Sequence, residues 1–275
     1  MHTFGRFACR ALFDSVVGFG NEVEFSFLYK TTTVRVLPVL IHGLNESSLM
    51  WQGWKGNEVF RNAFCPDLPG FAGNQELPEF EVSMAGYAEW LNFQLLKFEG
   101  PFLLVGHSMG GYLALEYLSR HAVQVKGIVL VNSYASADTE QRKRNREQAI
   151  ALLGKNPEAY FRMFLASLFE PEPEWLKRPE GKLMCRQMEG LNPEFIQRFL
   201  NGLKERRCHK ATVAKWKSLV HYVYGSADAM LDSEMLEKEI MEVGAQGLCI
   251  RGKGHMLPWQ AQEEVQVYIS KQFDL

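Results

Sequence analysis

The stretch that decides the fold is Phe102-Leu103-Leu104-Val105-Gly106-His107-Ser108-Met109-Gly110-Gly111. It joins an aliphatic run, typical of a buried β-strand, to a G-x-S-x-G motif and then to a helical pattern over Gly110–His121. A serine on so sharp a strand-to-helix turn has a strained backbone with other segments packed closely against it, so glycine fits best two positions to either side. The stretch therefore predicts that Ser108 is a nucleophile raised out of a sheet, beside the free amide groups of a helix N-terminus.

Further strands and helices are predicted on both sides of this motif. Each strand is a β-branched or aliphatic run bounded by polar residues or glycine, which is typical of strands covered on both faces. Because strands alternate with helical patterns, the sequence predicts an α/β fold with a mainly parallel sheet and helices on both faces. The predicted strands are Val36–His42, Pro101–His107, Gly127–Asn132 and Leu219–Tyr224, with weaker candidates at Val23–Tyr29, Phe64–Asp67 and Gly247–Arg251, and the helices outside the motif are Gly86–Phe98 and Gln260–Phe273.

The segment Ala135–Lys217 departs from this alternation. It contains no convincing strand, and a structureless connection of that length would be improbable, so we interpret it as a helical insertion rich in aromatic residues. This divides the chain into a core of residues 1–134 and 218–275 and an insertion of residues 135–217. Inside the insertion, Glu140 and Glu147 flank the basic run Arg142–Arg146, which favours a solvated helix face over a site for an anionic ligand.

Composition excludes several classes of protein. The 275 residues include 30 Lys and Arg against 32 Asp and Glu, a net charge of −2, whereas a dedicated nucleic-acid-binding protein would be strongly basic. No apolar run is long enough to cross a membrane, and Arg10 and Asp14 interrupt the only N-terminal candidate for a secretory signal. The five cysteines are scattered without a C-x-x-C pair, so neither a zinc site nor a disulfide framework is indicated, and a cytoplasmic location is expected.

A serine hydroxyl needs a base, and the base needs an acid to orient it. His255 lies in a glycine-rich loop just after a predicted strand, and Asp228 follows another strand end at Tyr224-Gly225-Ser226-Ala227. The chain order of nucleophile, acid and base is then the one expected for a G-x-S-x-G enzyme. Asp138 and, less favourably, Asp232 are the rival acids, since each also follows a predicted strand at some distance.

The negative charge that develops on the carbonyl oxygen also needs stabilisation. Two backbone amide groups usually supply it. We expect one from Met109, directly after the nucleophile, and the other from Leu44, in the loop that follows the strand ending at His42-Gly43. His42 is more readily interpreted as a structural residue that fixes this loop by hydrogen bonds than as a catalytic one.

Taken together, these motifs resemble those of the α/β-hydrolase family. The matching segments span most of the chain: Ile41-His42-Gly43, Asp67-Leu68-Pro69-Gly70, Gly106-His107-Ser108-Met109-Gly110-Gly111, Gly225-Ser226-Ala227-Asp228 and Gly254-His255-Met256. The resemblance implies a mainly parallel, eight-stranded type of sheet and an acyl-enzyme mechanism, and it makes the insertion a cap over the active site. Such a mechanism needs no metal and no organic cofactor. Among subgroups the chain is similar to capped small-molecule hydrolases such as proline iminopeptidases, meta-cleavage-product hydrolases and carboxylesterases.

Two segments depart from the family's pattern. The loop after Gly70 reads Phe71-Ala72-Gly73-Asn74 and lacks the usual second close glycine and serine, so that loop is expected to be reshaped. Trp51–Asn57 contains two glycines and an asparagine where a helix is expected, so that helix is expected to be short or displaced.

The sequence thus predicts a serine hydrolase, most similar to carboxylic ester hydrolases, that acts on a small acyl substrate: an ester, thioester or amide. Two alternatives remain open at this point. The same three residues could serve hydrolysis of a carbon–carbon bond or a lyase step, or the fold could be a ligand receptor with a vestigial triad. No feature of the sequence supports a nucleic-acid or membrane partner, and the oligomeric state is left open.

Overall fold

A sheet of five parallel strands occupies the centre of residues 35–275, the part of the chain that the computed structural model describes. The strands follow one another across the sheet in sequence order, from β1 to β5. β2 is buried at every position, as expected for an apolar strand with helices on both faces. The strands are β1 (Leu37–Ile41), β2 (Phe102–His107), β3 (Val125–Val131), β4 (Val220–Gly225) and β5 (Gln246–Ile250).

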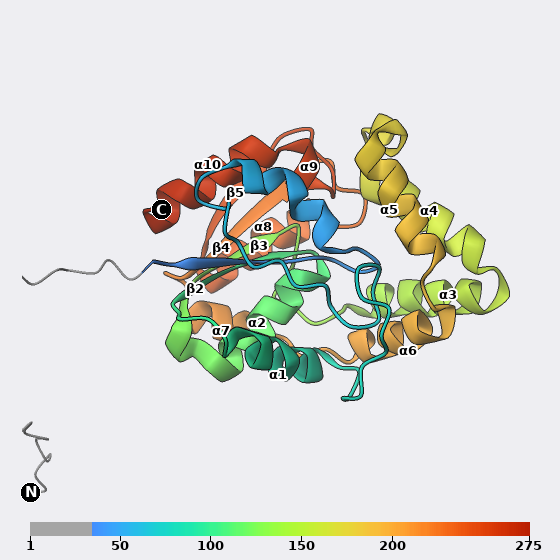
Figure 1. Ribbon diagram of the computed structural model, residues 1–275, viewed down its shortest axis with the longest axis horizontal. Helices are drawn as coiled ribbons and strands as arrows, with labels where there is room; N and C mark the ends of the chain where they lie inside the picture. Colours follow the sequence, from blue (N-terminus) through green and yellow to red (C-terminus); the bar gives the residue numbers. More distant parts are fainter. Residues whose placement is uncertain (1–34) are drawn as a thin grey trace, which may run out of the picture. The chain divides into compact units, whose positions relative to one another are not determined.

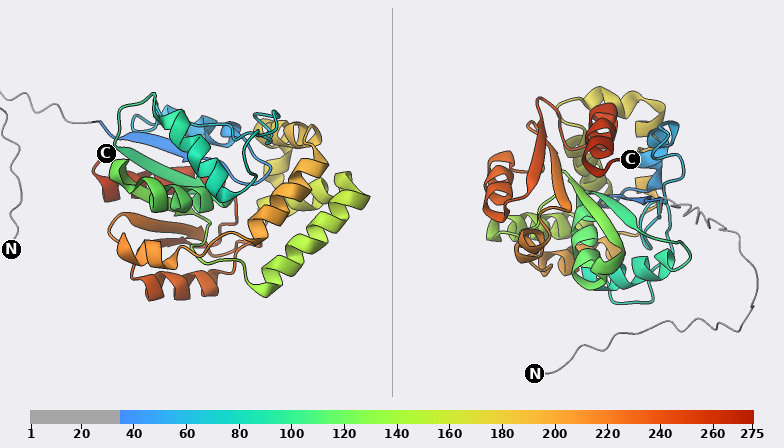
Figure 2. Two further views of the ribbon diagram at one scale, coloured as in Figure 1. Left: turned by 90° about the horizontal axis from the view of Figure 1, so that it is seen from below. Right: turned by 90° about the vertical axis from the view of Figure 1, so that its left-hand side faces the viewer.

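Helices cover both faces of this sheet (Figures 1 and 2). The 3₁₀ helix η1 and the C-terminal helix α10 lie on one face, and α1, α2 and α8 lie on the other. This arrangement buries the two apolar faces of the sheet and makes the core of the molecule. The bounds of these elements are η1 (Ser48–Gly56), α1 (Met84–Leu95), α2 (Met109–His121), η2 (Ala122–Gln124), α8 (Ser233–Val243), α9 (Leu257–Gln260) and α10 (Gln262–Phe273).

The chain between β3 and β4 is helical and contains no strand within residues 132–219. α4 and α6 begin in the same way: an asparagine caps the first turn with its side-chain oxygen, and proline, which lacks an amide hydrogen, takes the first helical position. The helices of this segment are α3 (Glu140–Lys155), α4 (Pro157–Phe169), η3 (Pro173–Lys177), α5 (Pro179–Glu189), α6 (Pro193–Lys204) and α7 (Lys210–Lys215). Of these, α3 to α6 lie beyond the carboxyl ends of the strands, whereas α7 lies beside α2 (Figure 1).

Most of the predicted strands are confirmed. The four strong candidates are β1 to β4, and the weaker candidate at 247–251 is β5. The candidate at 64–67 forms only an isolated parallel bridge between Val39 and Phe64, in which Leu40 N–H donates to the Phe64 carbonyl oxygen at 2.8 Å. The candidate at 23–29 lies outside the described residues. The described part therefore shows five strands where the family resemblance implies eight.

α3 begins at Glu140, so the basic run Arg142–Arg146 lies on a helix, as predicted. One element differs from its prediction. The expected helix over 51–57 is instead a 3₁₀ helix, in which side chains three positions apart point the same way. Trp51 and Trp54 are consequently both buried, and the Trp54 indole N–H donates to the carbonyl oxygen of Pro258 at 2.9 Å.

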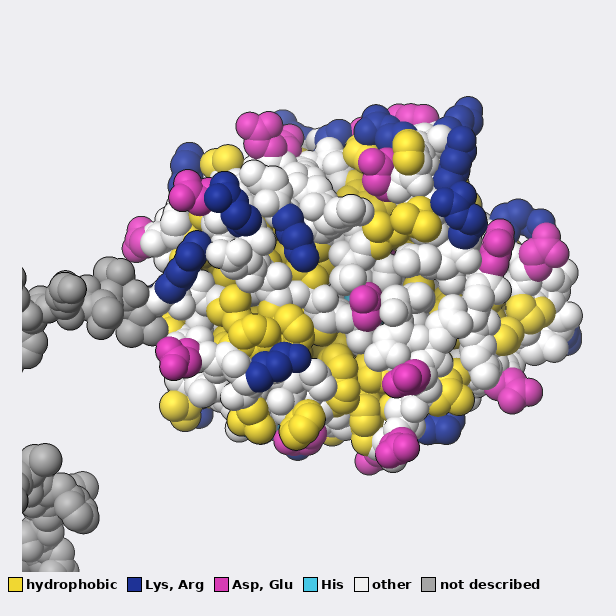
Figure 3. Space-filling view, in the orientation of Figure 1, with side chains coloured by type: hydrophobic (Ala, Val, Ile, Leu, Met, Phe, Trp, Pro, Cys, Tyr) yellow, Lys and Arg dark blue, Asp and Glu magenta, His cyan; other side chains and the backbone are white. Residues whose placement is uncertain are grey.

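The outer surface mixes charges of both signs with apolar areas. Figure 3 shows lysine and arginine interspersed with aspartate and glutamate over the visible face, with apolar side chains between them. Within residues 35–275, no helix has both the length and the apolar composition needed to cross a bilayer.

An aromatic cluster joins α6 to the core. The Phe199 ring lies edge-on against Phe71, with the centroids 4.8 Å apart, and against Tyr87 at 5.6 Å. Phe199 is 2% exposed, so α6 is fixed to the sheet domain by buried aromatic contact.

We predict that Phe199→Ala lowers the free energy of unfolding by about 3–5 kcal/mol, because it removes a buried ring and leaves a cavity. Urea denaturation measures the change. The matched control is Phe93→Ala on α1, where the ring is 70% exposed and the expected change is within about 0.5 kcal/mol. Equal effects of the two substitutions would contradict the prediction.

Candidate active site

Ser108 occupies the turn between β2 and α2 in a left-handed backbone conformation, with φ 49° and ψ −114°. Such a conformation is strained for a residue with a side chain and persists only where the surroundings enforce it. Here the Ser108 N–H donates to the Val131 carbonyl oxygen at 2.8 Å, and the Ser133 hydroxyl donates to the Ser108 carbonyl oxygen at 2.7 Å. The turn is therefore held from the neighbouring strand β3.

The glycines of the motif are required by close backbone packing. A Cβ atom on Gly106 would lie 2.3 Å from the carbonyl oxygen of Gly110, and one on Gly110 would lie 2.3 Å from that of Ile41. Neither position has space for any side chain, as the sequence predicts.

Asp228 and His255 are joined by a hydrogen bond. The His255 Nδ1 lies 2.7 Å from Asp228 Oδ2, and both side chains are almost fully buried. The other carboxylate oxygen of Asp228 accepts from the backbone N–H groups of Met230 and Leu231 at 2.7 and 3.0 Å. The carboxylate is thus fixed on both oxygens and holds the imidazole in one orientation.

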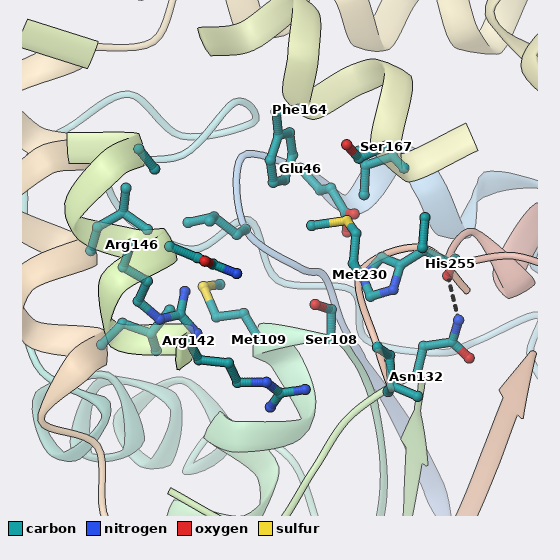
Figure 4. A pocket seen from close by; sticks show the side chains of 18 of the residues that line it. Glu46, Ser108, Met109, Asn132, Arg142, Arg146, Phe164, Ser167, Met230 and His255 are labelled. Atoms are coloured by element: carbon teal, nitrogen blue, oxygen red, sulfur yellow. Dashed lines mark hydrogen bonds between the residues drawn. The ribbon is translucent and has the colours of Figure 1, made fainter. Parts of the chain in front are cut away.

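The second ring nitrogen of His255, Nε2, lies on the side of the cavity that Ser108 also lines. His255 Nε2 is buried and has no hydrogen-bond partner among residues 35–275. Ser108 and His255 line the same cavity, of about 310 Å³, together with Leu44 and Met109 (Figure 4). No hydrogen bond joins Ser108 to His255 in the described structure. The structure therefore brings all five sequence-predicted site residues to one cavity, counting Asp228 through its bond to His255.

Neither rival acid contacts His255. Asp138 is buried in an ion-pair cluster with Arg146 and Arg206, whose Nη2 lies 3.1 Å from Asp138 Oδ1. Burial opposes ionisation of Asp138, but the two arginines outweigh it and hold its pKa below the usual value. Asp232 caps α8 by accepting from the Met235 N–H at 3.0 Å.

Asn132 contacts both Asp228 and His255, and the sequence analysis did not single it out. It directly follows β3 with φ 47°, a left-handed conformation that asparagine tolerates better than most residues. Its Nδ2 donates to Asp228 Oδ2 at 2.8 Å and to the His255 carbonyl oxygen at 2.9 Å, and its Oδ1 accepts from Gly225 N–H at 3.1 Å. One side-chain amide therefore joins the loops that carry Asp228 and His255, and Figure 4 shows its bond to His255.

His42 fixes the loop that carries Leu44, as predicted. Its Nε2 accepts from the Leu68 N–H at 3.0 Å, which leaves Nδ1 to donate to the Gly43 carbonyl oxygen at 2.8 Å. This pattern belongs to a neutral ring, in agreement with the burial that lowers the pKa of His42.

A buried carboxylate, Glu46, lies in the same loop and on the cavity wall, and it too was missed by the sequence analysis. Its Oε2 accepts from the Gly43 N–H at 2.6 Å and lies 3.0 Å from His107 Nδ1. The His107 Nε2 in turn bonds the His255 carbonyl oxygen at 2.9 Å. The pair therefore links the Leu44 loop, the serine turn and the loop of the base.

Glu46 and His107 hold each other in the charged form. Burial alone would raise the pKa of Glu46 and lower that of His107. Their mutual attraction and hydrogen bond outweigh burial, so the pKa of Glu46 lies below its ordinary value and the pKa of His107 lies above.

The basic run 142–146 is not uniformly solvated, so the interpretation made from sequence is wrong for part of it. Arg142, Asn145 and Arg146 line the cavity, whereas Lys143 pairs with Glu140 on the outer face. Positions four apart share one face of a helix, which explains why Arg142 and Arg146 face inward together.

The helical segment also touches the loop of the base. A Cβ atom on Gly254 would lie 1.7 Å from the carbonyl oxygen of Glu170, which follows α4. Lys253 Nζ lies 2.8 Å from Glu172 Oε1.

Among residues 35–275, no three His, Cys, Asp or Glu side chains gather as a metal site.

Residues 39–266 match the family model described as the alpha/beta hydrolase family. The chain belongs to this family. The assignment agrees with the parallel sheet, the serine turn and the cavity at the carboxyl ends of the strands, and it confirms the resemblance drawn from the motifs. The predicted division into core and cap is not tested by the match and stays a prediction.

Individual relatives add detail to the family assignment. Over 117 residues this chain is 32% identical to a putative 2-succinyl-6-hydroxy-2,4-cyclohexadiene-1-carboxylate synthase of Haemophilus influenzae, a match that covers 40% of the chain and 46% of the relative's length. The chain thus spans less than half of the curated relative that it matches.

Solved structures share the fold. A thermophilic esterase from Thermogutta terrifontis aligns with a TM-score of 0.72 at 24% identity, covering 86% of this chain and 88% of the esterase. A bromoperoxidase from Bacillus anthracis aligns with a TM-score of 0.73 at 16% identity, covering 87% and 92%. At these identities the likeness shows the fold alone.

We predict that Glu46→Gln removes a pH-dependent part of the stability. Because the pKa of folded His107 lies above its ordinary value of 6.5, the folded state keeps a proton that the unfolded state has released as the pH rises. The resulting stabilisation is complete below pH 6.5 and is lost as the pH rises through the pKa of folded His107. Without the Glu46 carboxylate, burial lowers that pKa, so this loss should disappear.

Urea denaturation of both proteins at intervals from about pH 6 to about pH 9 tests this prediction. The difference in unfolding free energy between wild type and variant should shrink as the pH rises. A difference that is constant across the range would contradict it.

Proposed function

We propose that this protein is a serine hydrolase that cleaves a small ester, thioester or amide through an acyl-enzyme. One observation carries the proposal: the imidazole of His255 is oriented by Asp228 through Nδ1, while Nε2 is unpaired among the described residues, in the cavity that Ser108 also lines. An unpaired base beside a strained serine is the arrangement that activates a hydroxyl group.

In the proposed first step, Ser108 Oγ attacks the substrate carbonyl carbon as His255 Nε2 takes the hydroxyl proton. Asp228 stabilises the imidazolium that forms. The backbone amides of Leu44 and Met109 are the proposed donors to the oxyanion, and both residues line the cavity.

In the second half, His255 gives its proton to the leaving group, which departs as an alcohol, thiol or amine. Water then attacks the acyl-enzyme with His255 again as the base, releasing the acid and regenerating Ser108. The helices between β3 and β4 are the proposed cap, residues 135–217, because Tyr160, Phe164, Leu168 and Leu200 from these helices line the cavity. In this proposal their apolar side chains keep water from the reacting groups.

A lyase step is the second candidate. The similarity to a protein named as a synthase of a cyclohexadiene carboxylate favours it, although that match covers only 40% of the chain. The same serine and histidine could then move a proton without forming an acyl-enzyme.

A fluorophosphonate and a panel of p-nitrophenyl esters separate these possibilities. Labelling of Ser108 together with brisk cleavage of short acyl esters is the expected result. Labelling without turnover favours the lyase or a more exacting substrate. Failure of the folded protein to react at all contradicts the proposed function and favours a non-catalytic receptor.

We predict that Asp228→Asn lowers kcat on a cleaved ester by about 10³–10⁴-fold, because the imidazole loses both its orientation and the charge that stabilises it. The matched control is Asp232→Asn, which keeps an N-capping side chain on α8 and should change kcat less than about twofold. If Asp138→Asn abolished turnover while Asp228→Asn did not, the assignment of the acid would be wrong.

A further inference from the structure

One wall of the active-site cavity has no part in the proposed mechanism. α3 contributes Arg142, Asn145 and Arg146 to it, two of them cationic. The few polar and charged groups on the wall of a ligand pocket fix the ligand's orientation by meeting complementary groups on it.

Arg146 is already occupied. Its guanidinium makes two hydrogen bonds to the Asp138 carboxylate, which also accepts from Arg206. One carboxylate thus faces the buried Arg206 and the partly buried Arg146, and Arg142 adds a third positive charge close enough to contribute to the lowered pKa of Asp138. The cluster has a surplus of positive charge at the cavity wall.

Arg142 has donors to spare. Its guanidinium lies over the Tyr134 ring at 3.7 Å from the centroid, a contact that holds the planar group in place. Its Nη1 is buried and has no hydrogen-bond partner within the described part of the chain. Buried donors nearly always have an acceptor, and a bound ligand would supply one here.

The position of Arg142 decides which part of the substrate it would bind. Figure 4 shows Ser108 between the two arginines of α3 on one side and His255 on the other. In the proposed mechanism His255 protonates the leaving group, so the leaving group occupies the imidazole side. The acyl part, which stays on Ser108, then extends toward the arginines.

We propose that the acyl part of the substrate carries a carboxylate that binds Arg142, so that the substrate is a half-ester, or the matching half-thioester or half-amide, of a small dicarboxylic acid. This inference rests on the proposed function. The cavity of about 310 Å³ lies at the small end of the range for ligand pockets, ~300–1,000 Å³, and suits an acid of a few carbons.

The test compares monomethyl glutarate with dimethyl glutarate, two esters that differ only in the free carboxylate, by following methanol release. We expect the wild type to prefer the monoester in kcat/KM. Arg142→Gln should lower the monoester-to-diester ratio of kcat/KM by about tenfold to a hundredfold, the size expected for one charge-assisted hydrogen bond.

The matched control is Arg144→Gln on the same helix. Arg144 is exposed and donates to Gln141, and it does not line the cavity. This variant should leave the ratio unchanged. A wild type that prefers the diester, or a ratio that Arg142→Gln does not change, would overturn the proposal.

Measuring the affinity for monomethyl glutarate tests the carboxylate site independently of whether the protein hydrolyses esters. In Ser108→Ala, calorimetry with monomethyl glutarate should show binding that Arg142→Gln weakens at least about tenfold and Arg144→Gln does not. This measurement decides the carboxylate site even if Ser108 fails to react with a fluorophosphonate and no ester is cleaved. No binding, or binding that does not depend on Arg142, would refute the carboxylate site.

Discussion

Parallel strands end at the same edge of a sheet, and every contact of the candidate site depends on that convergence. Ser108 follows β2, Asn132 follows β3, Asp228 follows β4 and His255 follows β5. The Asn132 amide reaches from the end of β3 to both the acid and the base, which are 27 residues apart in the chain. Without the common edge, no local conformation could bring these groups together.

Much of the site could be predicted because each of its parts carries a local signal. The glycines of the motif predict the Ser108 turn, because a turn this sharp leaves no space for larger residues. The structure shows this close backbone packing at Gly106 and Gly110. Asp228 could be favoured over Asp138 because it lies only a few residues past the end of a strand. His255 could be found because a glycine-rich loop after a strand presents a side chain freely. Such signals can be read from the sequence because a few neighbouring residues determine the backbone conformation at each of these positions.

What could not be predicted depends on how distant segments pack. The spacing of Arg142 and Arg146 shows that they share a helix face, but only the docking of α3 determines that this face meets the cavity. Glu46 looked like an ordinary loop residue, since its partner His107 is 61 positions away. Local propensity likewise does not reveal the 3₁₀ form of η1, in which both Trp51 and Trp54 are buried.

The contact between Glu170 and Gly254 bears on how this protein can be engineered. The backbone after α4 occupies the space that a side chain at position 254 would need, and the pair of Glu172 with Lys253 lies beside it. A chimaera that exchanged the whole helical segment would therefore replace the residues at 170–172 that contact the loop carrying His255. Grafts that keep the junction at 170–172 and exchange α3 alone would instead change the side chains that α3 presents to the cavity, while leaving the loop that carries His255 in place.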